Sequence, residues 1–521
     1  IGIVIALAAV IGKCLMDSGA ADRIVRSFLK ILGEKRAPVA LMGSGFVLSM
    51  PVFFDTVFYL LVPLARSLCR RTKKNYILYV TAIATGGAIT HTLVPPTPGP
   101  LLMAGNLGID VGKMILVGIM IGLPTALVGL LVCRVMNRLM DRPMRPYSGE
   151  PEPEPLGDDQ LPGLLVSLAP VLLPVLLISA STVVRTIADA EHAAQIREAD
   201  VADWPRLCTT LSAADANTES PAGRVMELLP ADVKPSLAAV ASGQYEDQSE
   251  ADVRAGLNTM LANREFYDED AFLGVKLSAP AKKMLGKNRA RLPNAEVERL
   301  NRLLLEAAFV DQIGPHFWET PRRKAANVTA LFGNANLALL LSAAISMIVL
   351  VRQRGLTLKQ LASTTENALM SGGVIILITA AGGAFGGMLR QCGIKDAIED
   401  MVPAGGGDVG FIMLCLGFGV AALMKVAQGS GTVSMITTSA MLGAMGVTST
   451  MLGFDVVYLA AAIGAGSLVG SWMNDSGFWI FARMSVLTET EVLKTWTILL
   501  SILGVVAFGF TLLAAWVSMM L

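Results

Sequence analysis

A proline- and glycine-rich stretch at residues 85–99, with the sequence TGGAITHTLVPPTPG, lies between two long apolar segments. Proline removes a helical hydrogen bond, so the sequence predicts a broken helix there. Lipid offers no hydrogen-bond partners, so such a break must be buried in protein or line a wet cavity. A second polar break, AQGSGTVS at residues 427–434, lies in the other half of the chain. Because transporters bind substrates and ions at interrupted helices, the two breaks predict a transporter with a central site.

The composition agrees with a membrane protein. Hydrophobic residues make up 53% of the chain and charged residues 16%, whereas soluble domains average about 25% charged. The zero formal net charge gives no support for nucleic-acid binding. No P-loop, nucleophile elbow or zinc motif is found, so we expect no enzyme activity, cofactor or metal. Apolar segments expected to span or enter the bilayer lie at about 1–16, 37–65, 76–103, 111–135, 163–184, 328–351, 365–389, 408–425, 432–447, 452–473 and 495–520.

Residues 185–325 are much more polar than the rest of the chain. Two stretches have the apolar spacing of amphipathic helices. One is residues 251–263, and the other starts at Asn294, which is expected to cap it. The apolar faces of these helices contain Val253, Leu257 and Leu261, and Val297, Leu300, Leu304 and Ala308. We therefore expect an inserted, water-facing, mostly helical domain, and a partly disordered loop is the alternative.

The insertion divides the chain into a membrane half at 1–184, the inserted domain at 185–325 and a second membrane half at 326–521. The first half starts inside an apolar run without Met, so we expect N-terminal helices to be missing from it. Lys and Arg in short loops mark the cytoplasmic side of a membrane protein. Basic clusters at 66–74, 134–145 and 352–359 therefore place the insertion outside, in the periplasm of a bacterial cell. Residues 17–36 disagree, because they would lie outside although they carry five Lys and Arg side chains.

Several motifs together resemble those of the gluconate permease (gluconate:proton symporter) family. They are IGKCLMDSG (11–19), GFVLSMPVFFDTVF (45–58), HTLVPPTPGP (91–100), AQGSGT (427–432), NDSGFW (474–479) and LKTW (493–496). The resemblance covers about 1–184 and 326–521. It implies an inner-membrane, proton-driven carrier of gluconate or a related sugar acid. It also implies an all-α polytopic fold of inverted repeats with broken helices and re-entrant hairpins, and a homodimer.

The chain departs from the family pattern in two places. Thr97 stands where the family often has His, which removes the basis for a proton role there. The insertion has no counterpart in typical members, so the resemblance says nothing about its role.

Two acidic residues are candidates for carrying the proton. Asp55 lies in an apolar segment, and a carboxylate at membrane depth costs about 2.5–3.5 kcal/mol on insertion scales. Such a group faces a cavity or a partner, or forms a structural hydrogen bond near a helix end. Asp475 lies between Asn474 and Ser476, and this trio can bind hydroxyls or a cation, or simply cap the helix that follows.

Lys425 precedes the second break, with no acid near it in the sequence. It can neutralise a substrate carboxylate, or it can extend its ammonium group to the membrane interface. His91 is the one histidine outside the insertion, and it can titrate near neutral pH or simply pack. The substrate-binding candidates are Thr85, Thr90, His91, Thr97, Lys425, Gln428, Ser430, Thr432, Asn474 and Ser476.

The sequence thus predicts proton-coupled uptake of gluconate or a similar sugar acid, with the lipid bilayer, the organic acid and protons as partners. One alternative is a cation-coupled carrier of dicarboxylates on the same architecture. A dicarboxylate would need two separate cationic groups, and only Lys425 is found. A more distant alternative is a membrane receptor that senses a ligand through residues 185–325.

Overall fold

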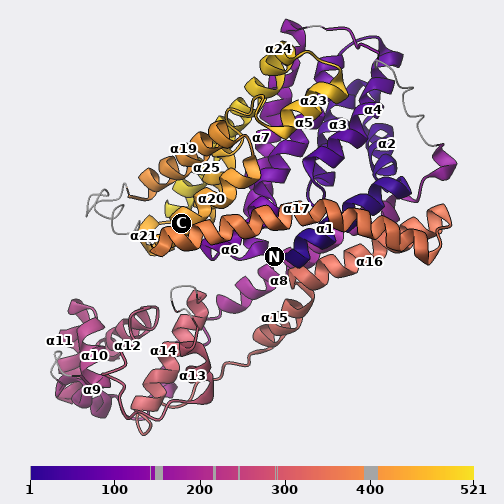
Figure 1. The fold of residues 1–521 in the computed structure, drawn as a ribbon. Helices are drawn as coiled ribbons and strands as arrows, with labels where there is room; N and C mark the ends of the chain where they lie inside the picture. The colour runs from indigo at the N-terminus through magenta and orange to yellow at the C-terminus, as the bar shows by residue number, and fades with distance from the viewer. Residues whose placement is uncertain are drawn as a thin grey trace. The chain divides into compact units, whose positions relative to one another are not determined.

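The chain forms helices joined by short loops, as the apolar segments predict (Figure 1). The computed structural model describes residues 2–140, 142–146, 157–214, 219–243, 247–287, 289, 292–391 and 409–520. The chain divides into two compact units. Unit 1 contains Ile1–Thr182 and Ala330–Leu521, and unit 2 contains Val183–Thr329.

Six helices among the described residues are long and apolar enough to cross a membrane, and a bent helix pair gives a seventh candidate. The bent pair is α1 (Gly2–Ser18) and α2 (Ala20–Leu32), which meet at 67°. The all-α polytopic prediction is therefore confirmed. The six spans are Tyr76–Leu107, Val111–Leu139, Leu164–Asp189, Ala335–Arg354, Val409–Gln428 and Glu489–Met520.

The first half of unit 1 contains a helix pair, a broken span and a long helix. The elements are α3 (Ala37–Leu48), α4 (Phe54–Thr72), α5 (Tyr76–Leu93), α6 (Pro98–Leu107) and α7 (Val111–Leu139). We call residues 49–53 the α3–α4 turn and residues 94–97 the α5–α6 break.

Two expectations about this half need correction. The apolar segment 37–65 is not one span, because the α3–α4 turn divides it at Pro51. The break expected over residues 85–99 is also narrower than the sequence suggested. Helix α5 continues to Leu93, and the proline pair interrupts only the residues after it.

The second half of unit 1 has the same pieces in the same order. The helix pair is α19 (Val409–Gln428) and α20 (Gly431–Ala444), and the broken span is α22 (Val457–Gly466) and α23 (Ser476–Ser485). The long helix consists of α24 (Glu489–Val492), the π-helix η6 (Leu493–Thr497) and α25 (Ile498–Met520). We call residues 429–430 the α19–α20 turn and residues 467–475 the α22–α23 break. The other helices of unit 1 are α8 (Leu164–Asp189), α16 (Ala335–Arg354), α17 (Leu358–Gln391) and α21 (Ser449–Leu452), with 3-10 turns η1 (Glu34–Arg36) and η2 (Asp158–Gln160).

Close helix packing holds these pieces together. Helices α5, α7 and α25 lie side by side (Figure 1). A side chain at Gly86 on α5 would lie 2.0 Å from the carbonyl oxygen of Met42 on α3, so only glycine fits between these helices. An aromatic cluster then joins the two halves, because the ring of Phe54 lies 5.2 Å from that of Trp496.

Two of the basic loops predicted to share one side meet at one end of unit 1. Arg66, in the C-terminal half of α4, donates to the carbonyl oxygen of Arg145 at 2.7 Å. Arg145 in turn forms two hydrogen bonds of 2.7 Å with the carboxylate of Glu491 at the start of α24. At the other end of α7, Lys113 pairs with Asp455 at 2.6 Å. Met519, near the end of α25, lies at this end too, because a Cβ at Gly453 would lie 3.5 Å from its Cε. The long helices α7 and α25 therefore connect the same two ends of the unit.

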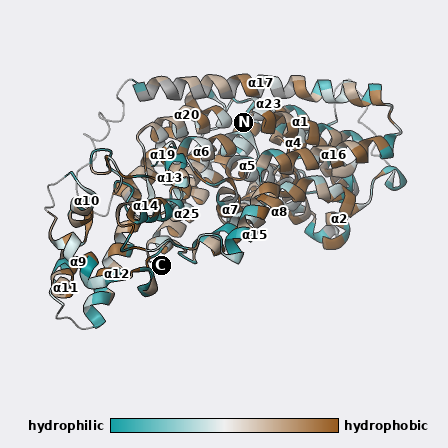
Figure 2. Ribbon diagram, turned by 90° about the horizontal axis from the view of Figure 1, so that it is seen from below, coloured by the Kyte–Doolittle hydropathy of each residue, from teal (hydrophilic) through white to brown (hydrophobic). Residues whose placement is uncertain are grey.

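Unit 2 is helical and has a hydrophobic core of its own. Its helices carry both polar and apolar residues, whereas those of unit 1 are mostly apolar (Figure 2). The elements are α9 (Trp204–Ser212), α10 (Pro221–Leu228), α11 (Lys234–Ala241), α12 (Asp247–Leu261), α13 (Ala279–Leu285), α14 (Asn294–Ala308) and α15 (Pro321–Phe332), with 3-10 turns η3 (Glu198–Asp200) and η4 (Ala231–Val233).

The two helices expected in the insertion are present as α12 and α14. The expected apolar faces are buried at Val253, Leu257, Leu261, Val297, Leu300 and Leu304, whereas Ala308 is only half-buried. The expected cap at Asn294 is wrong, because Pro293 occupies the capping position. The side-chain oxygen of Asn294 instead accepts a hydrogen bond from Arg264 at 2.7 Å.

Candidate functional site

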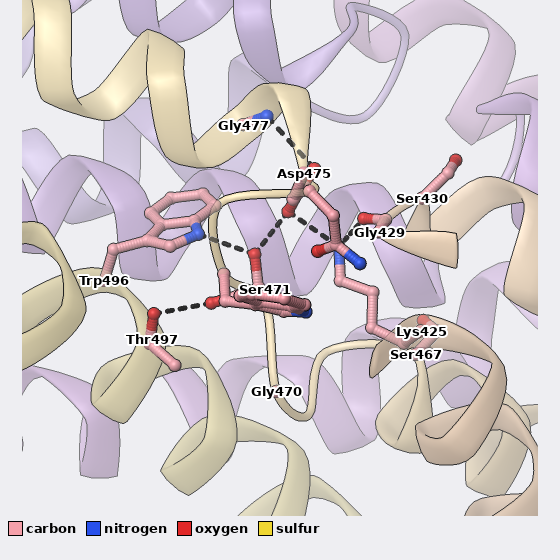
Figure 3. A network of polar contacts seen from close by, with 12 residues as sticks. Lys425, Gly429, Ser430, Ser467, Gly470, Ser471, Asp475, Gly477, Trp496 and Thr497 are labelled. Atoms are coloured by element: carbon pink, nitrogen blue, oxygen red, sulfur yellow. Dashed lines mark hydrogen bonds and ion pairs between the residues drawn. The ribbon is translucent and has the colours of Figure 1, made fainter. Parts of the chain in front are cut away.

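A buried ion pair joins the last turn of α19 to the α22–α23 break. The Nζ of Lys425 lies 2.7 Å from Oδ2 of Asp475, which is 50 positions away in the chain (Figure 3). Lys425 is 4% exposed and Asp475 is 8% exposed. Two charges removed from water in this way must neutralise each other, because an isolated buried charge is very costly.

The backbone of the α19–α20 turn places Lys425. Helix α19 ends at Gln428, and Gly429 follows with a φ of 80°, a left-handed conformation that favours glycine. Besides its bond to Asp475, Lys425 Nζ donates a hydrogen bond to the carbonyl oxygen of Gly429 at 2.6 Å. A Cβ at residue 429 would lie 2.1 Å from the carbonyl oxygen of Asn474, so the two unwound segments are in direct contact.

Asp475 is held in place by donors on both carboxylate oxygens. It is the N-cap of α23, and its Oδ1 accepts from the backbone N–H of Gly477 at 3.1 Å. Its Oδ2 accepts from the hydroxyl of Ser471 as well as from Lys425. The Ser471 hydroxyl oxygen accepts from the indole N–H of Trp496 at 2.7 Å (Figure 3). The polar groups of the α22–α23 break thus form one connected network.

The breaks of the two halves lie close together inside unit 1. Helix α6 packs along α20, and a Cβ at Gly99 would lie 2.2 Å from Cε of Met435. The end of α5 approaches α22 so closely that a Cβ at Gly464 would lie 2.9 Å from the carbonyl oxygen of Thr92. The proline-rich and glycine-rich stretches that the sequence singled out therefore meet, instead of lying at opposite surfaces.

Asp55 and His91 face the same region from the first half. Asp55 follows Phe54, whose ring lies 5.2 Å from that of Trp496, and His91 precedes Thr92, whose carbonyl oxygen approaches α22. Asp55 is half-buried in the first turn of α4, and within the described residues its carboxylate has no hydrogen-bond or ion-pair partner. The Nδ1 of His91 is buried and likewise lacks a partner among the described residues.

The threonines near the α5–α6 break fall into two groups. Thr85 donates to the carbonyl oxygen of Thr81 at 2.9 Å, and Thr97 donates to that of His91 at 3.0 Å. Their hydroxyls are therefore engaged by backbone within the same segment. Thr90 is fully buried, but its hydroxyl finds no partner among the described residues.

The remaining predicted residues lie around the ion pair. Ser430 caps α20, because its hydroxyl oxygen accepts from the backbone N–H of Val433 at 3.3 Å. Thr432 is half-buried, and the side chain of Asn474 donates to the carbonyl oxygen of Val426 at 2.8 Å. The side chains of Gln428, Asn474 and Ser476 are exposed.

Sequence reasoning missed three residues of this region. Ser471 and Trp496 complete the Asp475 network, and Ser49 lies in the α3–α4 turn. Trp496 belongs to the quoted motif LKTW, but nothing in that motif indicates which group its indole N–H contacts. Among the described residues, no group of three or more His, Cys, Asp or Glu side chains is placed to hold a metal ion.

Comparison with known proteins identifies similar sequences over almost the whole chain. The model of the GntP family permeases matches residues 1–201 and 305–517, so the match excludes most of unit 2. A gluconate permease of Pseudomonas aeruginosa is 27% identical over 519 residues, which cover 98% of this chain and 84% of the relative. The inner membrane permease YgbN of Escherichia coli K12 is 24% identical over 518 residues, covering 98% and 84%. The low-affinity gluconate transporter of the same strain is 24% identical over 507 residues, covering 97% and 83%.

Proposed function

Because this chain belongs to the GntP family of permeases, we propose that it is a secondary transporter that takes up gluconate or a related sugar acid together with protons. Six candidate spans make it a multi-pass membrane protein. Relatives named gluconate permease and low-affinity gluconate transporter support the substrate class, and the relative named inner membrane permease supports the location.

The observation that carries the proposal is the buried Lys425–Asp475 ion pair. A sugar acid has one carboxylate, and Lys425 is a buried cation that contacts both the α19–α20 turn and the α22–α23 break. In the proposed cycle, the substrate carboxylate takes the place of Asp475 on the Lys425 ammonium group. The ammonium group of Lys425 then still has two acceptors: the substrate carboxylate replaces Asp475, and the hydrogen bond to the carbonyl oxygen of Gly429 is kept.

Charge balance links this exchange to a proton. If the substrate displaced an ionised Asp475, the site would bury two anions and one cation, and the unpaired carboxylate would be costly. Protonation of Asp475 removes that charge, so the buried net charge is zero before and after the exchange. The protonated carboxyl group keeps partners in Ser471 and the N–H of Gly477. Proton and substrate therefore favour each other's binding, which is what symport requires.

The topology belongs to the same proposal. The matching order of elements in the two halves supports two repeats. Arg145, which follows the end of α7, binds Glu491 at the start of α24, which supports opposite orientations of the two long helices. The basic loops around Arg66 and Arg145 meet at one end of unit 1, and the positive-inside rule makes this end cytoplasmic. At the opposite end of α7, Asp110 accepts from Thr182, where the chain leaves unit 1 for the insertion. We therefore place residues 185–325 in the periplasm.

Uptake of radiolabelled gluconate into proteoliposomes with an imposed pH gradient tests the proposal. We expect accumulation that follows the gradient and collapses with a protonophore. In Asp475→Asn, which mimics the protonated acid, gluconate binding should lose its pH dependence and gradient-driven accumulation should disappear. Uptake that ignores the pH gradient and follows sodium would contradict the coupling, and an absence of any gluconate uptake would contradict the function.

A further inference from the structure

Three buried polar atoms near the α3–α4 turn have no hydrogen-bond partner among the described residues. They are Oγ of Ser49, Oγ1 of Thr90 and Nδ1 of His91. Ser49 and Thr90 are fully buried, at 0% exposure. An unpaired buried polar group costs about 1–3 kcal/mol, so a cluster of them needs an explanation.

These groups lie around one point on α5. A Cβ at Gly87 would lie 3.2 Å from Oγ of Ser49 and 3.0 Å from the ring of Phe54, so this face of α5 meets the α3–α4 turn. Thr90 and His91 follow Gly87 by three and four residues, which places them on the same face of the helix. The ring of Phe53, also in the turn, lies 6.3 Å from that of His91.

Neighbouring hydroxyls show that the chain can satisfy such groups without a ligand. On α5, Thr92 donates to the carbonyl oxygen of Ala88 at 2.9 Å, and Thr81 donates to that of Ile77 at 2.6 Å. On α3, Ser44 donates to the carbonyl oxygen of Ala40 at 2.7 Å. Thr90 on α5 and Ser49, the residue directly after α3, have no such bond, although each could in principle donate to nearby backbone.

We propose that Ser49, Thr90 and His91 form a subsite for the hydroxyl groups of a polyhydroxylated acid. The inference rests on the proposed transport function and specifies which part of the substrate this half recognises. A hydroxyl group both donates and accepts, so adjacent hydroxyls of a polyol chain suit two protein hydroxyls and an imidazole nitrogen. The ring of Phe54, which meets α5 at Gly87, lies 5.2 Å from the ring of Trp496 in the Asp475 network. The subsite is therefore placed to hold the chain of a substrate whose carboxylate binds Lys425.

Competition binding on the purified full chain in detergent tests the subsite. Unlabelled gluconate and hexanoate each compete with radiolabelled gluconate. Both are six-carbon monocarboxylates, but hexanoate lacks hydroxyls. The test variants are Ser49→Ala and Thr90→Val. The matched controls are Ser44→Ala and Thr92→Val, which remove hydroxyls that are already bonded within the same helices.

We expect each test variant to weaken gluconate binding by about 3- to 10-fold, as the loss of a hydrogen bond to a neutral group does. Hexanoate binding should be unchanged, because hexanoate offers no hydroxyl. Thr90→Ser keeps a hydroxyl, so it should retain most of the wild-type affinity even if Thr90→Val fails to fold. Equal losses for gluconate and hexanoate, or equal losses in test and control variants, would overturn the subsite. Failure of the wild-type chain to bind gluconate would instead contradict the proposed function.

Discussion

The α22–α23 break and the α3–α4 turn both carry polar groups deep inside unit 1, but only the first satisfies them. In the α22–α23 break, Asp475 and Ser471 exchange hydrogen bonds with Lys425, Trp496 and the backbone. At the α3–α4 turn, the Ser49 hydroxyl has no partner among the described residues. The two regions are otherwise alike, because each is an interruption between two apolar helices of the same unit.

This difference separates two roles of buried polar groups. A fully bonded network fixes the position of its members and makes each of them expensive to remove. An unpaired group contributes no bond that can be lost, so its removal should cost little stability. We therefore expect substitutions in the α22–α23 break to destabilise the fold, and substitutions at the α3–α4 turn to change ligand binding with little effect on stability.

The largest effect should come from breaking the buried ion pair. Lys425→Ala or Asp475→Ala leaves the other charge buried and unpaired, and each should lower the free energy of unfolding by about 3–5 kcal/mol. The double variant should lose less than either single one, because no charge remains. Unfolding in mixed micelles with increasing SDS measures these values.

The exposed pair Lys113–Asp455 provides the control, with side chains 45% and 34% exposed. Lys113→Ala should change the free energy of unfolding by no more than about 1 kcal/mol. If Lys113→Ala lowers the free energy of unfolding as much as Lys425→Ala, burial of the Lys425–Asp475 pair does not make its loss more costly.

Gly429→Ala should give the next largest effect. Its φ of 80° is strained for alanine, and the new Cβ would lie 2.1 Å from the carbonyl oxygen of Asn474. We expect a loss of about 1–3 kcal/mol in the same unfolding measurement. Gly419 lies in the same helix α19 with open space around its Cβ position. Gly419→Ala should therefore be neutral or stabilise by up to about 1 kcal/mol, and a loss at both positions would show that α19 tolerates no added methyl group.

A pair of serine variants compares the two regions directly. Ser471→Ala leaves the buried indole N–H of Trp496 without its acceptor, which should cost about 1–3 kcal/mol. Ser49→Ala removes a hydroxyl that has no partner among the described residues, so the free energy of unfolding should change by less than about 0.5 kcal/mol. Equal destabilisation by the two variants would mean that the Ser49 hydroxyl is bonded in the folded protein, and the contrast between the regions would fail.

Local chemistry made much of the fold predictable from the sequence. Apolar length indicated the membrane spans, and the glycines around Gln428 and the prolines after Leu93 indicated where helices stop. The α3–α4 turn was missed because a single proline, Pro51, interrupts an otherwise apolar stretch. Helix α5 extends further than its composition suggests because its neighbours bury it, and packing overrides weak local preference.

The pairing inside the site could not be read from the sequence. Lys425 has no acid near it along the chain, and its partner Asp475 comes from the next broken span. The sequence predicted that Asp475 caps a helix or takes part in the site, but nothing in it indicated that Lys425 is its partner. Likewise, nothing in the sequence distinguishes Thr90, whose hydroxyl has no partner among the described residues, from Thr92, which donates to the carbonyl oxygen of Ala88.

The smallest effect, and the one with opposite sign, should come from Asp55→Asn. Asp55 is half-buried in the first turn of α4, and its carboxylate has no hydrogen-bond or ion-pair partner among the described residues. A charged group at membrane depth is costly, so a neutral amide of the same shape should leave the free energy of unfolding unchanged or raise it by less than about 1 kcal/mol. The SDS titration used for Lys425→Ala measures both variants on one scale. A loss of several kcal/mol in Asp55→Asn would show that this carboxylate is bonded as firmly as Asp475, and the first half would then be a closed network like the second.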